Sequence, residues 1–218
     1  MSRCKLVVFD WDGTLVNSTA RIVDSMQQAA DIVGMPKLPD LAIKHIIGLG
    51  LPEAIRTLWP GINDATLAEM VPHYARFFVT DSKVEMDLFA GAVELLEELL
   101  QRGYLLAVAT GKTRKGLDRM MRDLNLGHLF AITRCADETH SKPDPLMLNE
   151  ILESLKLTPQ EALMVGDTSF DMDMATAANM SAVAMSYGAH DLVKLAASNP
   201  LGVCHNINEL RDWIITYG

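Results

Sequence analysis

The feature that most restricts the fold is a short apolar run, Leu6–Phe9, which ends abruptly at two acids, Asp10 and Asp12. A run of leucine, valine and phenylalanine of this length is typical of a strand that is buried on both faces of a parallel sheet. In open parallel sheets, ligands bind at the edge formed by the carboxyl ends of the strands. We therefore expect both carboxylates to lie at a ligand site, although an ordinary Asx-type turn after a strand would also favour aspartate and glycine here.

Segments with strand and helix patterns alternate from Phe89 onwards. Strands are expected at 104–109, 131–135, 162–165 and 181–185, with a weaker one near 203. Helices are expected at 91–101, 112–124 and 143–155, after 167, from 190, and at the end of the chain up to 215. Repeated strand and helix units predict an α/β fold, in which a Rossmann-like parallel sheet with right-handed crossovers has helices on both faces.

Residues 16–84 interrupt this alternation with helical patterns only. Helices are expected from a cap at Ser18 or Thr19 to residue 33, at 41–47, around 54–58, and from a cap at Asp64 to residue 78. Pro72 predicts a kink or a split in the last of them. The simplest arrangement is an inserted all-helical cap domain beside the sheet, with hinges near 16–18 and 82–89. The expected domains are an α/β core, residues 1–15 and 85–218, and a helical cap, residues 16–84.

The charge balance and the apolar runs argue against several kinds of partner. The formal net charge is -9 at pH 7, which disfavours nucleic acid, because a phosphate backbone is bound by a concentrated basic face. No apolar run has the length of a membrane span, and the N-terminal segment has no signal-peptide pattern, so we expect a cytoplasmic protein without a membrane partner. Neither a disulfide framework nor a zinc site is predicted, because the cysteines lack C-x-x-C spacing; they are Cys4, Cys135 and Cys204.

Three further segments carry polar residues where an expected strand ends or an expected helix begins. Thr110 and Gly111 follow the second strand of the core, where a hydroxyl and a backbone N–H can hold a phosphoryl oxygen. Lys142 precedes a helix in a proline-rich segment. Asp167 and Asp171 follow the fourth strand and lie on one side of the next turn. Taken singly, these features also fit a helix cap, a solvated loop lysine and acids at a helix N-terminus.

Taken together and in order, these residues match the motifs of a known family. The segment Asp10–Leu15, with the sequence Asp-Trp-Asp-Gly-Thr-Leu, resembles the first motif of the haloacid dehalogenase superfamily. Thr110, Lys142 and the Gly-Asp-x-x-x-Asp segment 166–171 match the other three motifs. The resemblance covers the whole chain and is closest to the phosphoglycolate phosphatase-like branch. It implies a phosphatase with a helical cap at the position of residues 16–84.

The family resemblance implies a magnesium ion at the sheet edge, and the charges agree with it. Four acids gathered there would repel one another unless a cation opposed them; they are Asp10, Asp12, Asp167 and Asp171. A magnesium ion and Lys142 supply three positive charges, and a protonated Asp12 would then make the site neutral. Mg²⁺ is expected rather than zinc because all the ligands are oxygens. The expected metal ligands are the carboxylates of Asp10 and Asp167 and the backbone carbonyl of Asp12.

The resemblance also implies a role for each residue. Asp10 is expected to attack phosphorus and form an aspartyl-phosphate intermediate, while Asp12 protonates the leaving alcohol and then acts as a base toward water. Asp171 is expected to orient Lys142 or a metal-bound water rather than to bind the metal directly. The catalytic residues are thus Asp10, Asp12 and Lys142. The residues expected to bind and neutralise the phosphoryl group are Thr110, Gly111 and Lys142.

Two other functions stay open at this point. A phosphomutase of the β-phosphoglucomutase type would keep all four motifs, but it would need cap groups that hold a sugar phosphate. A non-enzymatic phospho-receiver module would share the acids and the lysine, but it would need neither the cap nor Asp12. Asp12 also counts against a dehalogenase or a phosphonatase, because those relatives do not protonate an alkoxide.

The expected partner is a small phosphorylated metabolite, and phosphoglycolate is an analogy to the nearest branch. Lys44, His45 and Arg56 lie near the Gly48–Pro52 turn and can reach a substrate, but a surface position is the more ordinary interpretation. The basic run 112–122 is likewise interpreted as the solvated face of a helix. The sequence does not constrain the oligomeric state.

Overall fold

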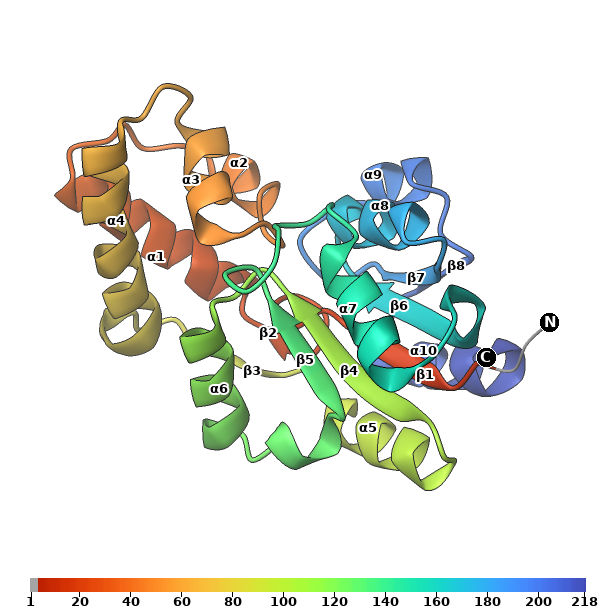
Figure 1. The fold of residues 1–218 in the computed structure, drawn as a ribbon. Helices are drawn as coiled ribbons and strands as arrows, with labels where there is room; N and C mark the ends of the chain where they lie inside the picture. The colour runs from red at the N-terminus through yellow and green to blue at the C-terminus, as the bar shows by residue number, and fades with distance from the viewer. Residues whose placement is uncertain (1–3) are drawn as a thin grey trace.

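The computed structural model describes residues 4–218 and confirms the expected α/β architecture (Figure 1). Its main sheet has six strands in the order β5-β4-β1-β6-β7-β8, and every neighbouring pair is parallel. β1 lies in the interior of the sheet, between β4 and β6. The strands are β1 Leu6–Phe9, β4 Leu105–Thr110, β5 Ile132–Cys135, β6 Ala162–Gly166, β7 Ser181–Met185 and β8 Gly202–Cys204.

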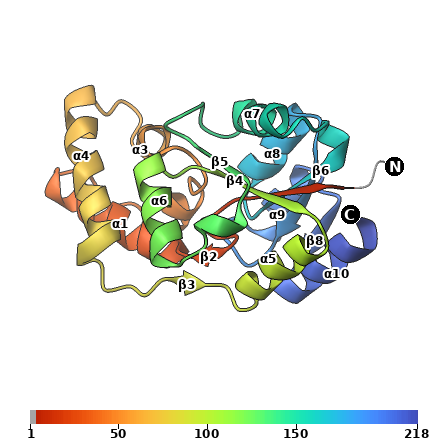
Figure 2. The same ribbon diagram turned by 60° about the horizontal axis from the view of Figure 1, so that its bottom comes forward.

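Helices cover both faces of the sheet (Figure 2), because alternate residues of a strand point to opposite sides. Val7 and Phe9 of β1 belong to one apolar cluster, together with residues of α5, α6 and α10. Leu6 and Val8 belong to a second cluster, together with residues of α7, α8 and α9. All four side chains are buried, as expected for a central strand. The helices are α5 Ala92–Gln101, α6 Arg114–Asp123, α7 Leu146–Leu155, α8 Ser169–Ala177, α9 Leu192–Ala197 and α10 Ile207–Tyr217.

A helical segment between β1 and β4 lies beside the carboxyl end of the sheet (Figure 1). It contains α1 Thr19–Ile32, α2 Asp40–Lys44, α3 Leu51–Leu58, α4 Asp64–Arg76 and a π-helical turn, η1 Phe77–Asp81. Two short antiparallel strands, β2 Val16–Asn17 and β3 Asp87–Leu88, connect it to the core. No strand was expected in these two connections. Their pairing holds the entry and the exit of the helical segment together.

Local interactions explain where helices differ from the expected boundaries. α4 continues through Pro72 and ends in the π-helical turn instead of splitting. Its N-cap is Asn63, whose side chain accepts a hydrogen bond from the N–H of Thr66 at 2.8 Å. α6 begins only at Arg114, because Thr113 is its N-cap. Residue 112 therefore lies in the loop before the helix.

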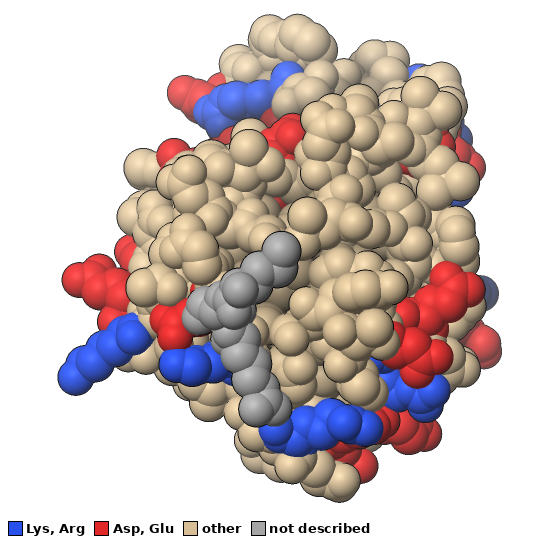
Figure 3. Space-filling model, turned by 90° about the vertical axis from the view of Figure 1, so that its right-hand side faces the viewer, with Lys and Arg blue, Asp and Glu red and all other residues tan. Residues whose placement is uncertain are grey.

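The face in Figure 3, which is the right-hand side of Figure 1, has acidic and basic side chains interspersed. A phosphate backbone is bound by a concentrated basic face, and this view contains no such gathering of lysine and arginine. Across residues 4–218, no helix combines the length and the apolar character needed to cross a bilayer.

Candidate active site

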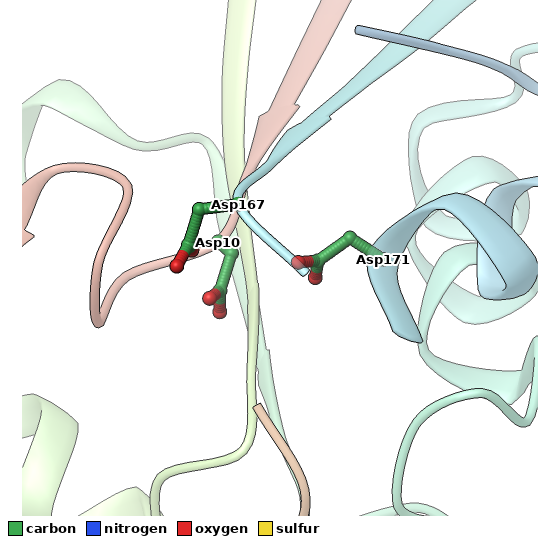
Figure 4. Close-up of side chains that lie close together, drawn as sticks. All are labelled: Asp10, Asp167 and Asp171. Atoms are coloured by element: carbon green, nitrogen blue, oxygen red, sulfur yellow. The ribbon is translucent and has the colours of Figure 1, made fainter. Parts of the chain in front are cut away.

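Two acids meet at the sheet edge because β1 and β6 are neighbours. Asp10 directly follows β1 and Asp167 directly follows β6, and the strands pair with Phe9 beside Val165. The backbone N–H of Asp10 donates to the carbonyl of Val165 at 2.9 Å. Asp171, in the first turn of α8, lies opposite them. One carboxylate oxygen from each of the three aspartates lies within 4.8 Å of the other two (Figure 4).

Lys142 is the counter-ion of this acidic group. Its Nζ donates to Oδ1 of Asp10 at 2.7 Å and to Oδ1 of Asp171 at 2.6 Å. The lysine side chain is 0% exposed, and such a charge is costly to bury without partners. Burial lowers the pKa of Lys142, but the carboxylates of Asp10 and Asp171 outweigh it and raise the pKa above its ordinary value. The loop lysine is therefore internal and charged.

Asp171 and Asp167 are held in place by further hydrogen bonds. The second oxygen of Asp171 accepts from the N–H and the hydroxyl of Thr168, at 3.0 and 2.7 Å. Both oxygens of Asp171 are thus engaged. Asp167 accepts from the hydroxyl of Thr14 at 2.7 Å and from the N–H of Ala189 at 2.7 Å. These bonds fix the direction of both carboxylates.

Carboxylate oxygens of Asp10 and Asp167 lie in a narrow buried space, and Gly13 borders that of Asp167. Oδ2 of Asp10 is buried and has no hydrogen-bond partner among the described residues. Gly13 has a φ of +85°, and a Cβ there would lie 2.2 Å from Oδ2 of Asp167. Glycine is therefore required at position 13 both by the left-handed backbone and by the close approach of a carboxylate.

Burial and mutual repulsion raise the pKa values of Asp10 and Asp167. Burial raises the pKa of Asp10 well above its ordinary value; Lys142 opposes this, and the charges of Asp171 and Asp167 add to it. Burial and the charge of Asp171 raise the pKa of Asp167 to about 7, while its own hydrogen bonds act in the opposite direction. If all three aspartates were ionised, their negative charge would exceed what Lys142 compensates, and a bound cation would balance this excess.

The carboxylate of Asp12 is turned toward Ser18 and Lys112. Its Oδ1 accepts from the hydroxyl of Ser18 at 2.6 Å. Nζ of Lys112 donates to both carboxylate oxygens, at 3.1 and 2.9 Å, and lies 4.3 Å from the ring centroid of Phe78. The Lys112 side chain is only 9% exposed. The interpretation of the basic run as a solvated helix face is therefore wrong for its first member.

Lys112 changes the charge balance expected from the sequence. The four carboxylates of the site face two lysines, Lys112 and Lys142. One divalent cation would then balance four ionised acids, and neutrality does not require a protonated Asp12. The sequence signal for Lys112 is its place directly after Thr110 and Gly111, because a residue that follows β4 lies at the same sheet edge as those that follow β1.

Thr110 and Gly111 form the part of the site nearest the helical segment. Thr110 is buried, and its hydroxyl accepts from the N–H of Lys112 at 3.2 Å. A Cβ at Gly111 would lie 2.5 Å from the carbonyl oxygen of Leu49 and 2.6 Å from that of Gly48. The absence of a side chain at position 111 therefore lets the loop before α3 approach the sheet edge.

A cavity of about 170 Å³ lies between the helical segment and the side chains of Asp10, Asp12 and Thr110. The cap residues singled out in the sequence, Lys44, His45 and Arg56, do not line this cavity. Arg56 is exposed, as the surface interpretation expects, whereas Lys44 and His45 are half-buried. Arg56 forms a surface ion pair with Asp64.

Comparisons with known proteins agree with this geometry. Residues 7–185 match the family model of haloacid dehalogenase-like hydrolases. The chain is 28% identical to a phosphoglycolate phosphatase of Vibrio vulnificus, over 97% of this chain and 96% of the relative. It is 31% identical to a phosphoglycolate phosphatase of Rhodospirillum rubrum, over 96% of this chain and 90% of the relative.

Solved structures that resemble this one include a haloacid dehalogenase-like family hydrolase from Streptococcus pneumoniae. Its TM-score is 0.83 and its sequence identity is 25%, and the match covers 98% of this chain and 99% of that one. A hydrolase from Pseudomonas syringae has a TM-score of 0.89 at 23% identity, covers 98% of this chain and 99% of that one, and supports the fold alone. The expectation of an enzyme from the resembled family is confirmed, and the chain belongs to the haloacid dehalogenase-like hydrolase family.

Proposed function

We propose that this hydrolase is a magnesium-dependent phosphatase that hydrolyses a small phosphate monoester. The observation that supports it most directly is the convergence of Asp10, Asp167 and Lys142, from three separate segments, at one buried sheet edge. Two relatives that match nearly the whole chain are named phosphoglycolate phosphatases, which supports the same reaction class. In this proposal, residues 16–84 act as the cap, and residues 1–15 and 85–218 form the core.

The side chains of the site fit a magnesium ion. Oδ2 of Asp10 is buried and unpartnered, and the donors nearby are carboxylate oxygens, which Mg²⁺ prefers. The proposed ligands are Asp10, Asp167 and the backbone carbonyl of Asp12. Asp171 is instead proposed to orient Lys142, because its Oδ1 accepts from Nζ of that lysine at 2.6 Å. When bound, the ion would neutralise charge on the phosphoryl oxygens.

Asp10 is the proposed nucleophile. A carboxylate oxygen attacks phosphorus in line, and the bond from phosphorus to the alcohol oxygen breaks as the new bond forms. Water then attacks the phosphorus of the aspartyl phosphate, which releases inorganic phosphate and restores the carboxylate. Lys142, fixed by Asp171, opposes the negative charge of the transferred group, together with the hydroxyl of Thr110 and the N–H of Gly111.

Asp12 is the proposed general acid and base. It gives a proton to the oxygen of the leaving alcohol and then takes one from the attacking water. In the structure, Asp12 is paired with Lys112 at 2.9 Å. We infer that this pair opens when substrate enters the cavity, because Asp12 must carry a proton at the moment the alcohol leaves.

Phosphate release from a panel of monoesters, with MgCl₂ and with EDTA, tests the proposal. Asp10→Asn should lower kcat/KM by at least about 10³-fold, because it removes the nucleophile. Asp173→Asn is the matched control, because Asp173 is exposed on α8. Turnover that survives Asp10→Asn would exclude Asp10 as the nucleophile. Asp12→Ala should impair alkyl esters far more than aryl esters, whose leaving groups need no proton; equal losses would exclude its role as an acid.

A further inference from the structure

We propose that the cavity beside Asp10 selects phosphate esters with an apolar alcohol, such as an alkyl chain of up to about six carbons. The inference rests on the proposed phosphatase function, because it assigns the cavity to the leaving group of that reaction. The inference specifies which class of phosphate monoester the proposed phosphatase would prefer.

The walls contributed by the helical segment are almost entirely apolar. α1 contributes Ile22, the loop before α3 contributes Ile47 and Leu49, and α4 and η1 contribute Val71 and Phe78. These side chains come from segments that are distant in sequence but converge on one cavity. An alcohol that leaves water for such a surface gains free energy in proportion to its apolar area.

The polar groups of the lining lie mainly on the core side of the cavity. Among residues 4–218, the charged side chains that line it are Asp10, Asp12, Lys112 and Arg119. Asp10 and Asp12 are assigned to the reaction, and Lys112 is paired with Asp12. The helical segment offers one polar side-chain group to the cavity, the hydroxyl of Tyr74, and burial and the nearby Asp12 raise the pKa of that tyrosine above its ordinary value.

A polar alcohol would lose its water in this cavity and find few partners, of which the hydroxyl of Tyr74 and the guanidinium of Arg119 are the main ones. The hydroxyls of a sugar or the carboxylate of glycolate need hydrogen bonds when they are buried, and unmet polar groups oppose binding. The one cation of the lining outside the Asp12 pair is Arg119, whose Nε is buried, lies 3.8 Å from a carboxylate oxygen of Asp123 and has no hydrogen-bond partner among the described residues. Recognition of a carboxylate by Arg119 is the competing interpretation, and it predicts a preference for phosphoglycolate.

The size of the cavity limits the alcohol. Its volume of about 170 Å³ is close to the roughly 150 Å³ of an engineered apolar cavity that binds benzene. Part of this space lies against Asp10 and Thr110, where the phosphoryl group belongs in the proposed reaction. A short chain or a single ring fits what is left.

A series of n-alkyl phosphates from ethyl to hexyl tests the inference, because the leaving groups differ only in buried length. With MgCl₂ present, kcat/KM should rise about fourfold for each added methylene until the cavity is filled. Ethyl phosphate should be at least as good a substrate as phosphoglycolate. A flat series, or a preference for phosphoglycolate that Arg119→Gln abolishes, would overturn the inference and leave the phosphatase function standing.

Calorimetric titration with n-alkylphosphonates separates this inference from the reaction itself. These compounds cannot be hydrolysed at an ester bond, and their Kd should fall about fourfold per methylene. If no ester is hydrolysed but the Kd follows chain length, the proposed function fails and the apolar site stands. If the Kd is independent of chain length, the apolar site fails whatever the turnover.

A variant that narrows the cavity tests whether the alkyl chain of the substrate binds there. Ala75 lines it from an exposed position on α4, so Ala75→Leu should fold while filling part of the space. The variant should lower kcat/KM for hexyl phosphate at least about tenfold relative to ethyl phosphate, because overfilled apolar sites exclude bulk. Ala196→Leu, at an exposed position on α9, is the matched control and should leave this ratio unchanged. An Ala75→Leu variant with an unchanged ratio would show that the chain binds elsewhere.

Discussion

The ion pair between Lys112 and Asp12 can be measured directly as a coupling free energy. The perturbation is a double-mutant cycle with Lys112→Met, Asp12→Asn and the double variant. Methionine keeps most of the length of the lysine stem and removes the charge, including the contact of Nζ with the Phe78 ring. The loss of that contact occurs in both variants that carry Lys112→Met, so it cancels in the cycle.

The structure sets the expected size of this coupling. The pair has two contacts, at 2.9 and 3.1 Å, and its side chains are only 9% and 12% exposed. Hydrogen bonds to charged groups contribute roughly 1.5–3 kcal/mol, and loss of one partner leaves the other charge buried and unpaired. The partial exposure to the cavity places the expected coupling at about 2 kcal/mol.

The assay is urea-induced unfolding at pH 7 in the presence of EDTA, so that metal binding does not contribute to the stability. Lys115→Met is the control, because Lys115 is exposed in the first turn of α6 and should change the free energy of unfolding by less than about 0.5 kcal/mol. If Lys112 were solvated, as the sequence pattern favoured, the coupling free energy between Lys112 and Asp12 would be below about 0.5 kcal/mol. That result would refute the buried ion pair and the charge balance built on it.

Three further perturbations test other parts of the site. Gly111→Ala should destabilise the fold by about 1–3 kcal/mol in urea unfolding, because the added Cβ would lie 2.5 Å from the carbonyl oxygen of Leu49; an unchanged midpoint would mean that the loop moves freely. Lys142→Met should destabilise the metal-free protein by about 3–5 kcal/mol, since two buried carboxylates lose their partner, and no loss would contradict the internal counter-ion. His190 is buried beside the start of α8, where its Nδ1 accepts from the N–H of Ser169 at 2.9 Å. Burial and the charge of Lys194 lower the pKa of His190 to about 4. The unfolded chain therefore binds a proton below about pH 6.5 that the folded chain does not, so this stability is complete above pH 6.5 and is lost toward pH 4. From pH 7 to pH 5, wild type should lose about 2 kcal/mol more than His190→Gln, and equal losses would contradict a neutral buried histidine.

The sequence by itself predicted the parallel sheet and the edge at which the acidic residues gather. The four-residue apolar run before Asp10 predicts a buried strand, and the repeated strand and helix units predict a parallel sheet with right-handed crossovers. Parallel strands bring their carboxyl ends to one side, so the residues after β1 and β6 meet there. The family resemblance implied the convergence of Asp10, Asp167 and Lys142, and the strand order, with β1 beside β6, brings it about.

Only the tertiary structure decided the partner of Asp12 and the character of the cavity. Lys112 and Asp12 are 100 residues apart, and nothing in the helical periodicity of the basic run separates a buried lysine from its exposed neighbours. The apolar walls combine side chains from α1, the loop before α3, α4 and η1, each of which by itself reads as ordinary core. The periodicity of a sequence indicates which face of a segment is apolar. Whether that face packs against other side chains or lines a cavity beside the carboxylate of Asp10 depends on how the whole chain folds.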